Sequence, residues 1–594
     1  MKVTVLEQVP EDTETILAWN NLVFRMERPE VFFSPQWAWA AGSAFSNSLR
    51  PLIFLIHDEE QLVGVAALAT DRESPETAFF LTASTADYCD LVSEPERRGA
   101  MWAAVFVEMK RLRVRELVLA NVPAESRTLQ VLKSVARSHH FHLYQRRSYD
   151  CGLISLRDEE ERQSVLQSLA RNETERRGLK KLAQLGPVHV NHLNGEQFDT
   201  ALQTIVLAHI SRFLAANRLS PLIVPSRRVF LTELARLLSA AGWLKISELE
   251  VNGEAIAWNY GFRFVDSWFW YLPTFRVERE KLSPGSCLMR LLAKEACGDL
   301  SVKRLDLGLG NEAYKKRVSN SIFSTCYVHL SNGLPRHLAT VGRHRLATTV
   351  GKFPVVDKEI RCGRDFFQSL RSQIRAKGLA ATVTHSVTKA GKHVASQEEI
   401  AFFEAPDALN RGDESAVLKP MGWEDLARAA IDNAEDRATL EYLMRCGQRL
   451  RKGQAIGYCL QDTRTQDALH FLWVGAYDGF QLSEIDTRLE SKDPGAAMIF
   501  DCWTPVEQRG RGRYAAAIRL LADHLQRQQR RAWIFSAVKN AASVRGIVAA
   551  GFEYRFSLLR KNTLFSTTLS QRGAANAAFR SSVVPGPPAA KAKT

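Results

Sequence analysis

Residues 497–526 constrain the fold most, because they read as a strand, a tight turn and a helix in direct succession. An apolar run at Ala497–Phe500 leads into the glycine and arginine cluster Arg509–Arg513, and a helical pattern then continues to about Gln526. Glycines let the backbone approach a ligand closely, and the unpaired amides at the start of a helix attract anions. The turn therefore predicts either a phosphate-binding site or an ordinary solvent-exposed turn.

Strand and helix patterns alternate along most of the 594 residues. Short runs typical of strands, such as Leu244–Val251, end at turn signals such as Asn252-Gly253. Stretches with helical periodicity lie between groups of these strands. Meandering strands between helices favour mixed, mainly antiparallel sheets. We predict an α/β chain with a first unit (1–157), a similar second unit (158–334), a basic linker (335–397) with a helix near residues 365–376, a third unit (398–565) and a disordered tail (566–594).

Charge and cysteine content narrow the range of partners and compartments. Lys and Arg number 79 against 65 Asp and Glu, a formal net charge of +14, which suits anionic partners. The nine cysteines form no CxxC pair, so neither a zinc site nor a disulfide framework is predicted. We find no export signal and no long apolar span, and therefore expect a cytoplasmic protein whose membrane contact, if any, is peripheral. No sequence pattern predicts specific nucleic-acid binding.

The glycine and arginine turn resembles the phosphate loop of the GNAT acyltransferase superfamily, Arg/Gln-x-x-Gly-x-Gly/Ala. A second match follows in the family's order, because Asn540 and Ser543 precede Gly551-Phe552 as in its next helix. The resemblance implies that acetyl-CoA or another acyl-CoA binds through Arg509, Gly510, Arg511, Gly512, Arg513 and Asn540. Two positions depart from the pattern: Tyr514 replaces a small residue, and Ile547 stands where many members carry a tyrosine that protonates the CoA thiolate.

A second group of chemically active residues lies at Leu305–Arg317. A short strand delivers Asp306 to a turn with two glycines, and Tyr314 and Lys315 follow closely. A carboxylate, a phenol and a cation in one turn can orient an amine, accept its proton and stabilise negative charge. The alternative is a structural salt bridge at the end of a strand.

This run is similar to the hallmark of the CelD-like (cellulose-biosynthesis) acetyltransferases, which are related to the Fem-type aminoacyltransferases with two GNAT folds in tandem. Further segments match in order over residues 1–330: Phe33–Trp37, Asp87–Asp90, Gly253–Ala257 and Ser283–Ser286. The resemblance implies an active region at Asp306, Glu312, Tyr314 and Lys315. It also implies a phosphate loop at Ser283, Gly285 and Ser286, for which a plain helix cap is the alternative.

Together these features predict tandem GNAT-like folds that carry an acyl-CoA-dependent N-acyltransferase without a metal. By family analogy, the acceptor is an amino sugar, a polysaccharide precursor or a similar small amine of envelope or exopolysaccharide metabolism. Two alternatives remain. One is a non-catalytic acyl-CoA sensor or scaffold, favoured by Tyr514 and Ile547, and the other is a Fem-like aminoacyltransferase.

Overall fold

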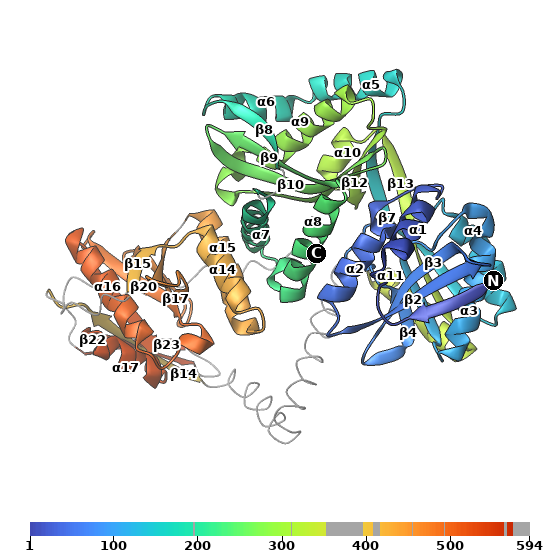
Figure 1. Cartoon of the computed structure of the whole chain (residues 1–594). Helices are drawn as coiled ribbons and strands as arrows, with labels where there is room; N and C mark the ends of the chain where they lie inside the picture. Colours follow the sequence, from blue (N-terminus) through green and yellow to red (C-terminus); the bar gives the residue numbers. More distant parts are fainter. Residues whose placement is uncertain are drawn as a thin grey trace. The chain divides into compact units, whose positions relative to one another are not determined.

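The computed structural model (Figure 1) describes residues 1–193, 197–310, 312–351, 396–407, 416–453, 455–491, 493–562 and 567–573. The chain divides into two compact units. The N-terminal unit comprises Met1–Arg212 and Pro221–Lys352, and the C-terminal unit comprises Phe213–Ser220 and Phe353–Thr594.

The N-terminal unit contains two successive sets of strands and helices. The first set consists of β1 (Lys2–Leu6), α1 (Thr13–Phe24), α2 (Pro35–Ala44), β2 (Leu49–Asp58), β3 (Gln61–Asp71), β4 (Ser74–Phe80), β5 (Val92–Ser93), α3 (Arg98–Arg111), β6 (Glu116–Pro123), α4 (Arg127–Ser138) and β7 (His142–Ser155). The second consists of α5 (Glu159–Arg171), α6 (Glu173–Ala183), β8 (Val188–Leu193), α7 (Gln197–Ala215), α8 (Pro225–Ala240), β9 (Leu244–Val251), β10 (Glu254–Phe264), β11 (Ser267–Phe275), α9 (Pro284–Gly298), β12 (Arg304–Leu309), α10 (Ala313–Val318), β13 (Ser321–Ser331) and α11 (Leu334–Gly351).

Both sets share one continuous sheet with an internal repeat. Its strand order is β1-β2-β3-β4-β6-β13-β7-β12-β11-β10-β9-β8, with β5 paired to β3. Each half has four antiparallel strands and then one parallel step across a helix, β4 to β6 in the first half and β11 to β12 in the second. The halves exchange their last strands, since β13 pairs with β6 and β7 pairs with β12. The predicted boundary at residue 157 therefore separates two sequence halves but not two sheets.

The C-terminal unit follows the same plan. Its elements are β14 (Ser396–Glu404), β15 (Ala416–Pro420), α14 (Trp423–Asp432), α15 (Arg437–Lys452), β16 (Ile456–Asp462), β17 (Ala468–Ala476), β18 (Gln481–Leu482), β19 (Thr487–Arg488), β20 (Ala496–Trp503), α16 (Arg513–Arg527), β21 (Arg531–Ala537), α17 (Ala541–Ala549), β22 (Glu553–Asn562) and β23 (Thr567–Gly573). The main sheet runs β15-β16-β17-β20-β21-β14-β22-β23, with its parallel step from β20 to β21. The predicted class, mixed α/β with mainly antiparallel sheets in three repeats, is confirmed.

Local sequence explains where several elements begin and turn. Asn252 and Gly253 both have positive φ (52° and 80°), so they close the β9–β10 hairpin that the sequence predicts. At the start of α2, Ser34 caps the helix by accepting a hydrogen bond from the Trp37 amide, and Pro35 occupies the first turn.

Two predicted segments differ from the structure. The predicted linker (335–397) overlaps helix α11 at its start and strand β14 at its end, whereas residues 352–395, including the helix predicted near 365–376, lie outside the described residues. The predicted tail begins at residue 566, but Thr567–Gly573 pairs with β22 because its extended run continues the sheet edge. Residues 574–594 lie outside the described part.

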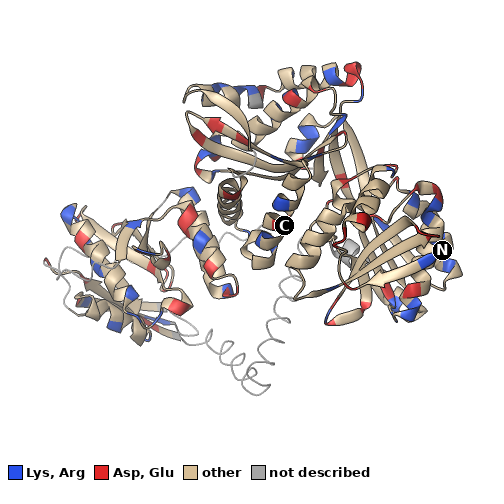
Figure 2. Cartoon of the chain, viewed as in Figure 1, with Lys and Arg blue, Asp and Glu red and all other residues tan. Residues whose placement is uncertain are grey.

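Several helices of both units carry Lys or Arg together with Asp or Glu (Figure 2). On α6, for example, Arg177 pairs with Glu173 at 2.7 Å. Within the described residues, no helix is both long and apolar enough to span a bilayer.

Candidate functional site

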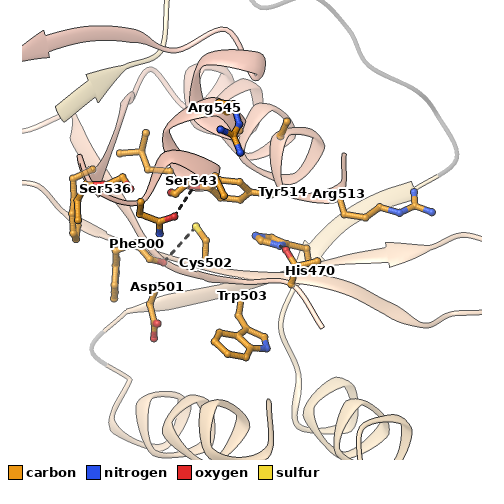
Figure 3. Close-up of a pocket in the computed structure, with 18 of the residues that line it drawn as sticks. His470, Phe500, Asp501, Cys502, Trp503, Arg513, Tyr514, Ser536, Ser543 and Arg545 are labelled. Carbon is orange, nitrogen blue, oxygen red and sulfur yellow. Dashed lines mark hydrogen bonds between the residues drawn. The ribbon is translucent and has the colours of Figure 1, made fainter. Parts of the chain in front are cut away.

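A large cavity opens in the C-terminal unit where β20 and β21 separate (Figure 3). The two strands pair only from Ala496 to Ile499 and from Arg531 to Ile534, and then diverge. The cavity has a volume of about 1280 Å³ and is lined by both strands, by β17, by the loop before α16 and by α17. Parallel strands that diverge beside a helix start create a concave site suited to an extended ligand.

A β-bulge shapes the floor of this cavity. Phe471 faces Trp503 and Trp473 faces Phe500, so β20 carries one residue more than β17 over this stretch. Asp501, within the bulge, has a positive φ of 48°. A bulge leaves one residue out of the ladder. We therefore expect a backbone amide of β20 to be free to bind a ligand here.

Helix α15 holds the bulge in place. The Tyr442 hydroxyl donates to the Asp501 carbonyl at 3.0 Å, and the Arg449 guanidinium pairs with the Asp501 carboxylate at 2.7 Å. Asp501 and Trp503 point to one side of the sheet, whereas Cys502 points to the other side, toward Tyr514 and Ser543 (Figure 3). The cavity thus has two chemically different faces.

The predicted phosphate loop forms one end of the cavity. Gly510 and Gly512 have φ of 74° and 72°, and Gly512 caps α16 without a side-chain hydrogen bond to the first helical amides. The buried Arg513 Nε has no hydrogen-bond partner among the described residues. Of the residues predicted to bind acyl-CoA in this unit, Arg511 is not among the lining residues of the cavity, whereas the others line it: Arg509, Gly510, Gly512, Arg513 and Asn540.

Asn540 and Arg509 also make contacts within the protein. The Asn540 side chain caps α17 by accepting from the Ser543 amide at 3.2 Å. Arg509 Nε donates to the Thr504 carbonyl, and its guanidinium lies over the Trp503 ring, 5.3 Å from the ring centre. Arg509 therefore points toward the α15 side of the cavity.

The two departures from the family pattern, Tyr514 and Ile547, belong to the same hydrophobic cluster. Tyr514 packs on Gly546 of α17, where a Cβ atom would lie only 2.4 Å from the ring, and its hydroxyl lies 3.1 Å from the Ser543 Oγ. Ile547 is fully buried in the core. Glycine at 546 therefore explains how a tyrosine fits at a position that the family fills with a small residue.

His470 on β17 is a cavity residue that the sequence reasoning missed. Its Nδ1 lies 2.8 Å from the Thr504 Oγ1, its ring lies 5.4 Å from the Tyr514 ring, and its buried Nε2 has no partner among the described residues. Burial lowers the pKa of His470 to about 3, so the ring is neutral. Burial also raises the pKa of the Cys502 thiol, which opposes a thiolate nucleophile.

In the N-terminal unit, Asp306 on β12 is fully buried. Its carboxylate accepts from the Tyr88 hydroxyl at 2.7 Å, from the Gly308 amide at 2.9 Å and from Arg28 at 3.0 Å. Tyr88 and Arg28 belong to the first set of elements, and Asp306 belongs to the second. The carboxylate therefore joins the two folds.

The other predicted residues of this signature lie nearby. Lys315 is buried; its Nζ donates to the Leu309 carbonyl at 2.7 Å and pairs with Glu312 at 3.1 Å. Burial, above all, raises the pKa of Tyr314. Asp87 is half-buried, and desolvation with the nearby Asp306 charge raises its pKa to about 7. The signature is thus a buried network of charged and polar groups.

The second predicted phosphate loop is a helix start, as expected. Ser283 has a φ of 53° and caps α9 without a side-chain hydrogen bond, and Pro284 begins the helix. Helix α6 covers part of this turn, since a Cβ on Gly178 would lie 3.2 Å from the Leu282 carbonyl oxygen and 2.9 Å from the Cys287 sulfur. Ser283, Gly285 and Ser286 do not line the large cavity, which belongs to the other unit.

Within the described ranges, no group of three or more His, Cys, Asp and Glu side chains could hold a metal ion.

Residues 170–316 match the family described as Acetyltransferase (GNAT) domain. No curated protein matches the chain. Residues 170–316 therefore constitute a GNAT-type acyltransferase domain. The match lies in the second fold of the N-terminal unit, whereas the large cavity lies in the C-terminal unit.

Solved structures similar to the chain include FemX, with 10% identity and a TM-score of 0.42 over 57% of this chain and 99% of that chain. Another is the C-terminal domain of a putative lysylphosphatidylglycerol synthetase from Agrobacterium fabrum, with 12% identity and a TM-score of 0.36 over 55% and 95%. A third is a tandem GNAT protein from the clavulanic acid biosynthesis pathway, with 12% identity and a TM-score of 0.32 over 56% and 99%.

Proposed function

We propose that the chain is an acyl-CoA-dependent N-acyltransferase whose thioester site is the cavity of the C-terminal unit. One observation carries this proposal: a strand bulge and an uncapped helix start open into the same large cavity. The bulge supplies an amide for a carbonyl oxygen, and the helix start supplies amides for a phosphate. An acyl-CoA carries both groups.

The pyrophosphate would bind the amides at the start of α16, next to Gly512 and Arg513. The pantetheine arm would then follow β20, and the thioester carbonyl would accept a hydrogen bond at the bulge near Asp501. Such a bond stabilises the negative charge that develops on the carbonyl oxygen. Tyr514 and His470, both in the cavity wall, would contact the bound arm.

The acceptor amine would attack from the α15 side of β20. Asp501 and Glu484 are the carboxylates among the residues that line the cavity, and Asp501 points to this side (Figure 3). The amine would lose its proton to Asp501 while its nitrogen forms the new bond to the acyl carbon. The carbon–sulfur bond then breaks, and CoA leaves as a thiolate.

We assign the signature of the N-terminal unit a joining role in this proposal. Asp306 and Lys315 are buried and hydrogen-bonded, which supports a structural network rather than direct contact with a substrate. Tyr314 and the turn at Ser283–Ser286 remain candidates for a second acyl-CoA site in the matched domain. The resemblance of residues 1–330 to CelD-like acetyltransferases supports an amino sugar or polysaccharide precursor as the acceptor.

Thiol release from acetyl-CoA tests the proposal. The full-length protein should release free thiol with at least one amine, and Asp501→Asn should lower kcat at least about tenfold because the carboxylate that accepts the proton is lost. The matched control is Asp478→Asn, since Asp478 lies outside the cavity lining. Tight CoA binding without thiol release would support the alternative of a non-catalytic acyl-CoA sensor or scaffold. Transfer from an aminoacyl-tRNA but not from acetyl-CoA would support the alternative of a Fem-like aminoacyltransferase.

A further inference from the structure

An aromatic pair with two arginines forms the α15 side of the cavity. The rings of Tyr442 and Trp503 are stacked, with centres 5.1 Å apart and planes 13° from parallel. The Arg445 guanidinium lies over Tyr442 and the Arg509 guanidinium lies over Trp503, at 5.6 and 5.3 Å from the ring centres. Both arginines line the cavity. A guanidinium that lies over a ring keeps its N–H edge free for a bidentate partner.

Neither arginine forms an ion pair among the described residues, although the Asp436 carboxylate before α15 lies near enough to Arg509 to interact with it electrostatically. Within the described residues, no carboxylate lies within 4 Å of Arg445 or Arg509, whereas the neighbouring Arg449 is paired with Asp501 at 2.7 Å. The cavity lining as a whole carries more cations than anions: Arg445, Arg449, Arg509, Arg513 and Arg545 against Glu484 and Asp501. Positive charge therefore remains for an anionic ligand on the side where the acceptor would enter.

This positive charge lies apart from the proposed phosphate site. Trp503, beneath Arg509, points to the α15 side of the sheet, whereas Tyr514 at the start of α16 lies on the opposite side (Figure 3). The phosphates of the acyl-CoA would be held at the start of α16. The two arginines on the stacked pair are then free to bind the second substrate.

We infer that the acceptor is an anionic amine, whose carboxylate or phosphate group binds Arg445 and Arg509 while its amino group lies at Asp501. The inference rests on the proposed function, because it concerns the second substrate of the same cavity. A charge-assisted, bidentate contact is stronger and more directional than a neutral one. It would hold the amine in a fixed position beside the thioester.

Matched pairs of amines test this inference with the full-length protein and acetyl-CoA. Glycine against glycinamide tests a carboxylate, and glucosamine 6-phosphate against glucosamine tests a phosphate. The charged member of one pair should have a kcat/KM at least about tenfold higher than its neutral partner. A preference in the glycine pair would identify a carboxylate as the recognised group, and a preference in the glucosamine pair would identify a phosphate.

Arg445→Gln should reduce that preference to about twofold or less through a higher KM for the acceptor, with the KM for acetyl-CoA unchanged. Arg509→Gln should act in the same direction. Arg437→Gln is the matched control, since Arg437 lies on the same helix, is exposed and does not line the cavity. It should leave the preference intact.

Three results would overturn the inference. Equal turnover of both members of each pair would show that no anion is recognised. An unchanged preference in Arg445→Gln would show that the anionic group of the acceptor binds at another site. A raised KM for acetyl-CoA in that variant would show that Arg445 binds CoA instead. Absence of acetyl-CoA binding by the wild-type protein would instead refute the proposed function.

Discussion

Replacing Gly546 by alanine perturbs the contact that lets Tyr514 occupy the cavity wall. The new Cβ would lie 2.4 Å from Cδ1 and 2.9 Å from Cε1 of the Tyr514 ring. The ring cannot withdraw freely, because it lies beside His470 and its hydroxyl lies 3.1 Å from the Ser543 Oγ. Overpacking of this kind typically destabilises a protein by about 1–3 kcal/mol.

The same substitution has an opposite effect when the ring is absent. Alanine in a helix is more favourable than glycine by about 0.5–1 kcal/mol, and Gly546 has an ordinary helical backbone. Gly546→Ala should therefore stabilise a Tyr514→Ala protein by about 0.5–1 kcal/mol while it destabilises the wild type. The coupling energy between the two substitutions is the difference between these two effects and should be about 1.5–4 kcal/mol.

Native-state hydrogen exchange of the full-length protein measures this coupling. Peptides from β20 and α17 report the opening free energy of the C-terminal unit in the wild type, both single variants and the double variant. Gly342→Ala in α11 is the control, because a Cβ there meets no atom within 4 Å. Additive effects of the two substitutions would refute the contact and the account of why tyrosine fits here.

Three further substitutions test the titratable side chains Asp306, Asp87 and His470. Asp306→Ala should destabilise the N-terminal unit by on the order of 3 kcal/mol, since it leaves Arg28 with one carboxylate fewer; loss of turnover with unchanged urea unfolding would instead indicate a catalytic carboxylate. The raised pKa of Asp87, about 7 against 3.8, gives stability that is fully present below pH 3.8 and is lost as the pH rises to about 7. Asp87→Asn should flatten this part of the stability profile, and an unchanged profile would contradict the assigned pKa. The pKa of His470, lowered from 6.5 to about 3, gives stability present above pH 6.5 and lost as the pH falls; His470→Gln should remove this loss in hydrogen exchange of the C-terminal unit.

Local features of the fold could be predicted because they depend on neighbouring residues. The Asn252-Gly253 turn and the glycine loop before α16 follow from backbone freedom at those positions, and the structure has positive φ at all of their glycines. The strand before the loop and the helix after it follow from their apolar patterns. The predicted acyl-CoA phosphate loop of the C-terminal unit depends on these local features, so it could be proposed from the sequence.

Contacts between distant segments could not be predicted in this way. Arg28 and Asp306 are 278 residues apart, so their pairing depends on the exchange of β7 and β13, which no local pattern encodes. The stacking of Tyr442 on Trp503 joins α15 and β20, which are separated in the chain by β16, β17, β18 and β19. His470 was missed because a single histidine in an apolar strand carries no sign of the cavity beside it.

The central claim is that acyl-CoA binds at the start of α16 in the C-terminal unit. Gly512→Asp places a negative charge at the N-cap of α16, where the φ of 72° also disfavours a side chain, and Ser286→Asp places the same charge in the first turn of α9. Calorimetric titration of CoA into both full-length variants compares the two helix starts directly. The account predicts at least about a tenfold loss of affinity in Gly512→Asp and none in Ser286→Asp. Loss of affinity in Ser286→Asp with wild-type affinity in Gly512→Asp would contradict it.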